Sequence, residues 1–218
     1  MQPPKVTLSF DNGPEPQVTP AVLDCLARHG VAATFFVMGR KSATAAGFEV
    51  LTRAVAAGHR VGNHTYSHST PLGEMERVAA LAEFEKTERI LARLKQTDRY
   101  FRPYGRSGKL GRHLLHPAVV ERLQTGGYTC VLWNSVPGDW RDPHGWVGRA
   151  LDDCRSRRWS LVVLHDTPTG AMLHLDEFLR RLRAEGTDFT QDYPPECMPI
   201  VEGQIVGPIE RFVADEAA

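Results

Sequence analysis

Several short polar clusters in this sequence carry side chains that can move protons or bind a metal ion. Asp11 and His165 each follow a run of apolar residues, where a carboxylate or an imidazole is well placed for proton transfer. His64 and His68 lie four residues apart. Two imidazoles at this spacing share one face of a helical turn and can chelate one divalent ion. The clusters occupy residues 9–14, 64–68, 101–105, 133–140 and 161–166.

Two further polar residues have the chemistry of orienting groups. The guanidinium of Arg102 is always charged and can hold a carboxylate through a two-pronged contact. Asp139 stands beside Trp140 in a loop with Gly and Pro, which suits the wall of a pocket. Taken one at a time, these clusters also fit plain turns, a surface arginine, surface histidines or a buried core histidine. Their joint occurrence favours a catalytic site.

Alternating strand-like and helix-like segments position these clusters. The strand-like runs cover residues 6–10, 32–38, 60–63, 100–101, 130–133 and 161–164. Helical patterns cover residues 19–30, 48–57, 70–94, 117–123, 146–155 and 173–183. This alternation predicts a parallel sheet with helical crossovers, either open or closed into a barrel. Because sites in such folds gather at the carboxyl ends of the strands, we expect the polar clusters to meet there.

Length and composition are those of one globular domain, which we expect to span residues 1–218, with an irregular segment over about 188–218. The 26 basic and 26 acidic side chains argue against a general nucleic-acid binder or a polybasic membrane anchor. No apolar run predicts a membrane-spanning helix, and no secretory leader is visible, which favours the cytoplasm unless a leader was removed. The four cysteines lack metal or redox spacing and are expected to be buried. The sequence does not indicate the oligomeric state.

In order and content, the clusters resemble the polysaccharide deacetylase family, also called the NodB-homology domain or carbohydrate esterase family 4. The family pattern runs T-F-D-D-G-P, H-[ST]-x-x-H, R-x-P-Y, D-x-x-D-W and L-x-H, and its counterparts here lie between residues 6 and 166. The resemblance implies an α/β fold, a distorted (β/α) barrel with seven or eight mostly parallel strands. It also implies a hydrolase that removes N-acetyl groups from an N-acetylated sugar, oligosaccharide or glycan.

The resemblance further implies a role for each matching residue. Asp11 corresponds to the general base and Arg102 to the residue that orients it. His165 corresponds to the general acid and Asp139 to its orienting partner. The metal, expected to be zinc, polarises the carbonyl and activates the water. The remaining implied positions are the metal ligands His64, His68 and Asn12, the oxyanion-binding Tyr104, and Trp140, Val163 and Leu164 around the acetyl group.

The sequence departs from the family pattern at four places. Asn12 replaces the aspartate that is normally the third metal ligand, and an amide oxygen brings no charge, so the affinity for the metal is expected to fall. The third motif, residues 102–104, is one residue shorter than in the family. Val136 replaces the first aspartate of the fourth motif. Val163 replaces the leucine of the fifth motif but keeps an apolar surface for an acetyl methyl group.

Two other functions are compatible with these residues. One is a different C–N hydrolase on the same fold, which acts on a cyclic amide or ureido compound without a metal. Asn12 favours this alternative, and the intact pair of His64 and His68 disfavours it. The other is an inactive carbohydrate-binding relative, which the retention of both proton-transfer residues and both orienting partners disfavours. Metal content distinguishes the first alternative from the leading interpretation.

Overall fold

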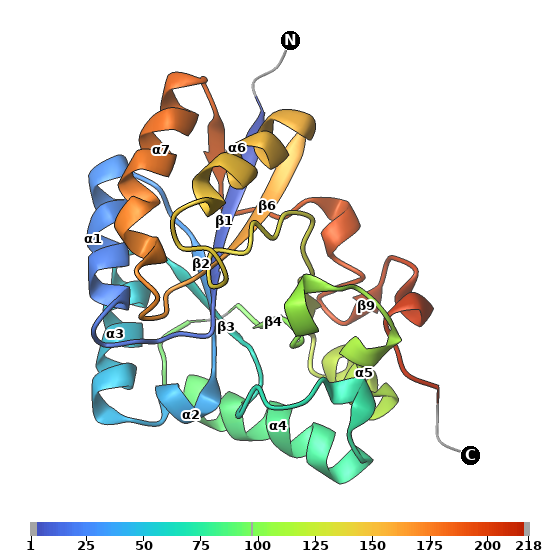
Figure 1. The fold of residues 1–218 in the computed structure, drawn as a ribbon. Helices are drawn as coiled ribbons and strands as arrows, with labels where there is room; N and C mark the ends of the chain where they lie inside the picture. The colour runs from blue at the N-terminus through green and yellow to red at the C-terminus, as the bar shows by residue number, and fades with distance from the viewer. Residues whose placement is uncertain (1–3, 97, 216–218) are drawn as a thin grey trace.

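Six parallel strands form the centre of the computed structural model, which describes residues 4–96 and 98–215. They are β1 (Lys5–Asp11), β2 (Thr34–Val37), β3 (Arg60–Asn63), β4 (Tyr100–Phe101), β5 (Thr129–Cys130) and β6 (Trp159–His165), and they lie in the order β6-β1-β2-β3-β4-β5. An isolated parallel bridge between Ser135 and Val162 joins the chain after β5 to β6 and closes the ring. The predicted distorted barrel is therefore confirmed (Figure 1).

Helices alternate with these strands and cover them from outside. They are α1 (Thr19–His29), α2 (Gly39–Ser42), α3 (Ala45–Ala56), α4 (Arg77–Leu91), α5 (Pro117–Thr125), α6 (Trp146–Ser156) and α7 (Leu175–Ala184). Short 3₁₀ helices are η1 (Leu72–Glu74), η2 (Arg106–Gly108), η3 (Arg112–Leu114), η4 (Ala171–His174), η5 (Pro195–Cys197) and η6 (Ile209–Arg211). Figure 1 shows α1, α3 and α7 along one flank of the strands and α4 and α5 on another.

Strand β1 shows how the sequence divides the two faces of the sheet. Val6, Leu8 and Phe10 are fully buried in the main apolar core, which they share with residues of α1, α6 and α7. Successive side chains of a strand point to opposite faces, so the alternate residues Ser9 and Asp11 face the interior of the barrel. The two-residue period of β1 therefore supplies both the core and the first polar groups of the site.

The C-terminal segment adds three strands, so the described residues hold nine strands where seven or eight were expected. β7 (Asp188–Thr190) pairs in parallel with the first half of β1. Sequence patterning misses β7 because it has three residues, none of them fully buried. β8 (Ile200–Val201) and β9 (Gln204–Ile205) form an antiparallel hairpin around Gly203, within the segment that was expected to be irregular. Figure 1 places this hairpin on the side of the molecule opposite to α1.

Several predicted boundaries differ from those of the structure, and two of the differences have a clear form. The sequence predicts a helix from residue 70, but α4 begins at Arg77 and η1 precedes it. The predicted strand over 130–133 ends at Cys130, because Leu132 donates its backbone N–H to the carbonyl of Cys197 instead of to the neighbouring strand. All four cysteines are buried, as expected. Within the described ranges, no helix is both long and apolar enough to cross a membrane.

Candidate active site

The polar residues at the ends of the parallel strands meet around one pocket of about 240 Å³. The strand register explains this meeting, because Asp11 lies directly beside His165 in the parallel pair of β1 and β6. Neighbouring strands are about 4.8 Å apart, so both side chains reach the same space. The pocket is lined by Asp11, Asn12, His64, His68, Tyr104, Gly105, Ser107, Gly108, Trp133, Val136, Trp140, Val163 and His165.

A buried ion pair fixes the carboxylate of Asp11. Arg102 is fully buried, and its Nη1 donates to Asp11 Oδ1 at 2.8 Å and to Ser9 Oγ at 2.7 Å. Its other donors reach the backbone carbonyls of Val131 and Leu132, both at 3.1 Å. A buried charge is costly unless it is paired and hydrogen-bonded, and here both conditions are met for the guanidinium. The predicted contact between Arg102 and Asp11 is therefore present.

His64 and His68 both line the pocket, and their ring centroids are 4.8 Å apart. They do not lie on a helical turn, as the spacing predicted; His68 has a left-handed backbone with a φ of 56°. His64 Nδ1 donates to the carbonyl of Arg102 at 2.8 Å, so Nε2 is left free on the side of Asp11. Burial lowers the pKa of His64, and burial together with the nearby His64 lowers the pKa of His68 to about 2. Both rings are neutral at pH 7, the form that binds metals.

Asn12 adds an oxygen to these two imidazoles. Its Oδ1 is buried and has no hydrogen-bond partner among the residues that the structure describes. A buried amide oxygen without a donor is costly, and a cation is a natural partner for it. Asn12 adopts a left-handed backbone with a φ of 73°, which asparagine and aspartate tolerate better than most residues. Two neutral imidazoles and one orphan oxygen fit a divalent metal ion.

The imidazole of His165 is held by a buried carboxylate. Asp139 is fully buried, and its Oδ1 accepts from His165 Nδ1 at 2.9 Å while its Oδ2 accepts from the backbone N–H of His165 at 2.8 Å. The indole of Trp140 packs edge-on against the ring of His165. Burial alone lowers the pKa of His165, but the hydrogen bond and charge of Asp139 outweigh it, so the pKa is raised. A raised pKa favours the protonated ring, which can act as an acid.

Comparisons with known proteins show the family of this chain. The family model described as polysaccharide deacetylase matches residues 1–118, and a chitooligosaccharide deacetylase of Sinorhizobium fredii is 32% identical over 167 residues, which are 75% of this chain and 72% of that protein. The chain belongs to the polysaccharide deacetylase family. The peptidoglycan-N-acetylglucosamine deacetylase PgdA of Listeria monocytogenes is 30% identical over 190 residues, 85% of this chain but 37% of its own length.

Solved structures of this family have the same fold. The Bc1960 peptidoglycan N-acetylglucosamine deacetylase aligns with a TM-score of 0.72 at 28% identity, over 85% of each chain. A family pseudoenzyme from Bacillus anthracis, 23% identical over 86% of this chain and 63% of its own, aligns with a TM-score of 0.71, so the fold alone does not decide activity. Deacetylases of the family depend on a divalent metal, and a family 4 acetyl xylan esterase of Clostridium thermocellum was solved with a cobalt ion.

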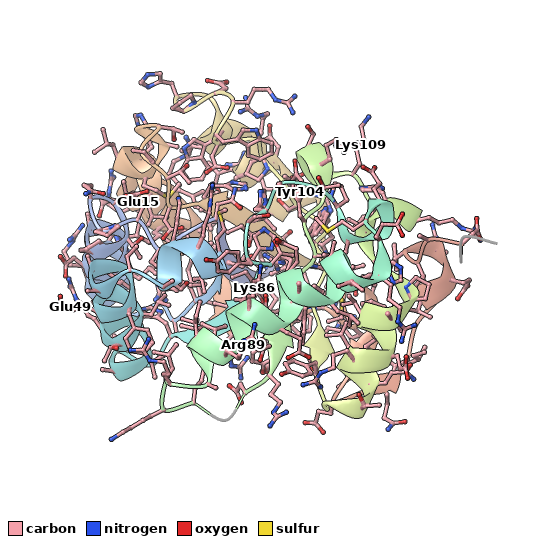
Figure 2. The ribbon with its side chains drawn as sticks, turned by 90° about the horizontal axis from the view of Figure 1, so that it is seen from below. Glu15, Glu49, Lys86, Arg89, Tyr104 and Lys109 are labelled. Carbon is pink, nitrogen blue, oxygen red and sulfur yellow. The ribbon has the colours of Figure 1, made fainter. Side chains whose placement is uncertain are left out.

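The pocket walls include residues to which the family motifs give no role. Trp133 lines the pocket, and its Nε1 donates to the carbonyl of Gly108 at 2.9 Å. A Cβ on Gly105 would lie 2.2 Å from the Trp133 ring, so glycine at this position leaves room for the indole. Figure 2 marks Tyr104 and Lys109 on the same loop. Trp133 is the last residue of the predicted strand over 130–133 and the first residue of the polar cluster over 133–140, and this position was the available signal.

Two predicted substrate contacts have different outcomes. Val163 lines the pocket, as expected for a residue that receives an acetyl methyl group. Leu164 does not, because its side chain is fully buried in the main apolar core. The two residues are adjacent on β6, and adjacent side chains of a strand point to opposite faces. The structure therefore corrects the prediction for Leu164.

Proposed function

We propose that this chain removes N-acetyl groups from an N-acetylated sugar, with Asp11 as the general base and His165 as the general acid. The observation that carries this assignment is the registered pairing of these two residues on β1 and β6, at the edge of one pocket. The buried, positively charged Arg102 orients Asp11, and the buried carboxylate of Asp139 orients His165. Carbohydrate N-deacetylation as the class of activity, predicted from the sequence, is confirmed by the family and by its relatives. The residue roles are our proposal.

Asp11 takes the proton of the attacking water through Oδ2. Its Oδ1 already accepts from Arg102, and its Oδ2 faces His64 Nε2 at 3.6 Å. The positive charge of Arg102 offsets the cost of burying the carboxylate and holds it in one orientation. Because one oxygen is anchored, the other keeps a constant position relative to the bound substrate, which a base in proton transfer requires.

His64, His68 and Asn12 would hold a divalent metal ion, which we propose to be zinc. When bound, the ion polarises the acetyl carbonyl and lowers the pKa of its water toward about 7. Imidazole ligands favour zinc over magnesium or calcium, which prefer oxygen ligands. The ligand set carries no charge because Asn12 stands where the family has an aspartate. We therefore expect weaker binding than in family members with that aspartate.

His165 protonates the departing sugar nitrogen. Because its Nδ1–H donates to Asp139, the ring presents Nε2 to the pocket. The backbone N–H of Tyr104 donates to no acceptor in the described part of the chain, so it is free to bind the oxyanion. Val163 and Trp140 supply the apolar surface for the acetyl methyl group.

The walls of the pocket favour a sugar ring as the substrate. Tyr104, Trp133 and Trp140 line it, and flat aromatic faces bury the apolar faces of pyranose rings well. Two kinds of relative are named for chitooligosaccharides and for peptidoglycan N-acetylglucosamine. We propose an oligosaccharide that contains N-acetylglucosamine as the substrate. We also propose that the described residues form one catalytic domain, because Ile200 and Phe212 of the C-terminal segment belong to the apolar cluster beneath β4 and β5.

The test measures acetate release from chito-oligosaccharides and from peptidoglycan fragments. The protein is first treated with a chelator and dialysed, and is then assayed with and without added Zn²⁺. We expect activity on at least one substrate that chelation removes and zinc restores. Activity that survives complete metal removal contradicts the metal-assisted assignment and favours a metal-independent C–N hydrolase. Failure to release acetate from any substrate, with zinc bound, favours an inactive carbohydrate-binding relative.

A further inference from the structure

Two imidazoles outside the pocket meet at hydrogen-bond distance. His144 lies between Trp140 and α6, and His174 ends η4 just before α7. The Nδ1 atom of His144 is 3.2 Å from the Nε2 atom of His174, and the ring centroids are 5.3 Å apart. His144 is exposed and His174 is half-buried, so solvent and small ions reach the pair. Neither residue has a part in the proposed deacetylation.

The separation of these two nitrogens matches that of two ligands on one metal ion. In a tetrahedral zinc site each imidazole nitrogen lies about 2.0–2.1 Å from the ion, which places two such nitrogens about 3.3 Å apart. Either ring nitrogen of a histidine can be the ligand when the proton resides on the other one. Among the described residues, neither ring makes another side-chain hydrogen bond, so each can carry its proton on the nitrogen that faces water.

We propose that His144 and His174 form a second, surface site for a divalent ion that prefers imidazole, namely Zn²⁺, Ni²⁺ or Cu²⁺. Two protein nitrogens leave the remaining coordination positions to water. Asp142 is not available as a third ligand. Its Oδ1 accepts from the backbone N–H of Gly145 at 3.0 Å, and its Oδ2 accepts from Arg149 at 2.8 Å.

Another cluster with metal-binding atoms is a weaker candidate. Cys25, His29 and Asp176 each place one such atom within 4.8 Å of the others. However, Asp176 accepts from His29 at 2.9 Å and from Arg180 at 2.8 Å, and Arg28 lies 4.0 Å away. Two permanent positive charges neutralise the carboxylate and repel a divalent ion. This cluster is an ion-pair network, and its histidine provides a matched control.

An ion on the pair joins two segments that the fold already brings together. The segment of His144 follows Trp140 on the pocket wall, and the segment of His174 follows β6. Trp146 Nε1 donates to the carbonyl of Ala171 at 3.1 Å, which is a hydrogen bond between the same two segments. A ligand that binds the folded chain and not the unfolded chain raises its melting temperature. Metal binding at this pair therefore stabilises the protein against unfolding.

Equilibrium dialysis with Ni²⁺ tests the proposal by counting the ions bound per chain. We expect the wild type to bind one ion more than His144→Gln or His174→Gln, and His29→Gln to bind as many as the wild type. Both substituted side chains of the pair reach solvent, so the variants are expected to fold, which circular dichroism verifies. Electron paramagnetic resonance with Cu²⁺ gives a second readout, because loss of either ring removes one nitrogen from the copper signal.

The site is independent of the metal proposed for the pocket. A variant with His64→Gln and His68→Gln is expected to lose the pocket ion and keep the ion on the surface pair, so failure of one assignment does not affect the other. Equal numbers of ions in the wild type and in both single variants of the pair overturn the proposal. Loss of an ion in His29→Gln, with no loss in either variant of the pair, also overturns it, because the ion then belongs to the cluster on α1 and α7.

Discussion

At the scale of single residues, each proton-transfer group owes its chemistry to one buried partner. Arg102 leaves Asp11 one anchored and one free carboxylate oxygen. Asp139 sets both the tautomer and the pKa of His165. These partners do not touch the reacting atoms, but they decide which form of the base and the acid faces the substrate. The predictions at this scale change one group and leave its surroundings in place.

Replacement of Asp11 tests its assignment as the general base. Asp11→Asn keeps the size of the side chain but cannot accept the proton of the water. We expect kcat to fall at least about a hundredfold, the usual contribution of a general base. Metal content, measured by mass spectrometry, is expected to stay at the wild-type value because Asp11 is not a proposed ligand. A kcat equal to that of the wild type contradicts the base assignment.

Replacement of Asp139, the partner of the proposed acid His165, changes the dependence of kcat on pH. His165 must be protonated to act as an acid, so activity falls as the pH rises through its pKa. Asp139 raises that pKa. In Asp139→Asn the pKa of His165 therefore falls, and the alkaline limb of the profile of kcat against pH moves to lower pH. Asp142→Asn, three residues away, is expected to leave the limb unchanged; an unmoved limb in both variants removes Asp139 from this role.

Asn12 stands where the family has a carboxylate that binds the metal. Asn12→Asp restores a charged ligand at a position whose left-handed backbone aspartate also tolerates. We expect the affinity for Zn²⁺, measured by competition with a chromophoric chelator, to rise roughly tenfold or more, because a carboxylate adds charge to a neutral ligand set. An unchanged affinity would mean that the side chain of Asn12 does not reach the metal.

At the scale of elements, Asp166 holds the loop after β1 against the end of β6. It is fully buried, and its Oδ2 accepts from the hydroxyl of Thr19 at 2.5 Å. The same hydroxyl accepts from the backbone N–H of Glu15 at 2.8 Å. A Cβ on Gly13 would lie 2.3 Å from Asp166, so only glycine allows this approach. The loop that carries Asn12 is therefore fixed to the strand that carries His165.

This buried carboxyl predicts a pH dependence of stability. Burial raises the pKa of Asp166 to about 7 in the folded chain, above its value of about 4 in the unfolded chain. The folded state thus favours the neutral form. The contribution of Asp166 to the free energy of unfolding is fully present below about pH 4 and is lost as the pH rises through about 7. In metal-free protein, urea unfolding at a series of pH values is expected to show this loss, and Asp166→Asn is expected to remove it. An identical pH dependence in the variant contradicts the prediction.

The sequence allows prediction of elements with strong periodicity and misses those set by distant contacts. Within the helical pattern over residues 70–94, Ala80, Phe84, Thr87 and Leu91 recur with a 3.6-residue period, and all four are buried on α4. Leu94 continues the spacing and is buried just beyond the end of the helix. The turn between His64 and His68 could not be predicted. Glu83 on α4 accepts from the backbone N–H groups of Tyr66 and Ser67, at 3.0 and 2.8 Å. Local patterning cannot reveal a conformation that a residue on another element imposes.

The place where the candidate site residues meet could be predicted from the sequence, whereas their roles stay a prediction. Asp11, His64, Arg102 and His165 each come directly after a predicted strand, and the carboxyl ends of parallel strands share one edge. Leu164 was misplaced because the motif alone does not give the phase of β6. The motifs give no role to Lys86 and Arg89, which Figure 2 shows on α4.

At the scale of the whole molecule, the backbone of Ser135 forms the bridge that joins the chain after β5 to β6, and the side chain of Asn134 adds two hydrogen bonds to β6 beside it. The backbone N–H of Ser135 donates to the carbonyl of Leu161 at 3.2 Å, and its carbonyl accepts from the N–H of Val163 at 2.9 Å. Its hydroxyl donates to Asp153 on α6 at 2.8 Å. Ser135 is buried, so water cannot replace these partners.

Two substitutions at this position separate the backbone bridge from the side chain. Ser135→Ala removes the hydroxyl and keeps the bridge, whereas Ser135→Pro also removes the N–H and leaves the carbonyl of Leu161 without its donor. We expect the proline variant to be less stable than the alanine variant by about 2 kcal/mol or more, measured by urea unfolding. Equal stability of the two variants would show that the bridge does not hold the ring closed.

The registered ladder between β1 and β6 has a further consequence. Seven consecutive residue pairs fix Asp11 beside His165, whereas the aromatic walls of the pocket come from loops after β4 and β5. The spacing of the two proton-transfer groups is thus set by the sheet and not by the aromatic residues that contact the sugar. The same loops carry Asp139, which orients His165, and the backbone N–H of Tyr104, so exchange of whole loops would remove both. Point substitutions at Trp133 and Trp140 can instead redirect the pocket to other acetamido compounds, which makes these two positions suitable targets for directed evolution of substrate range.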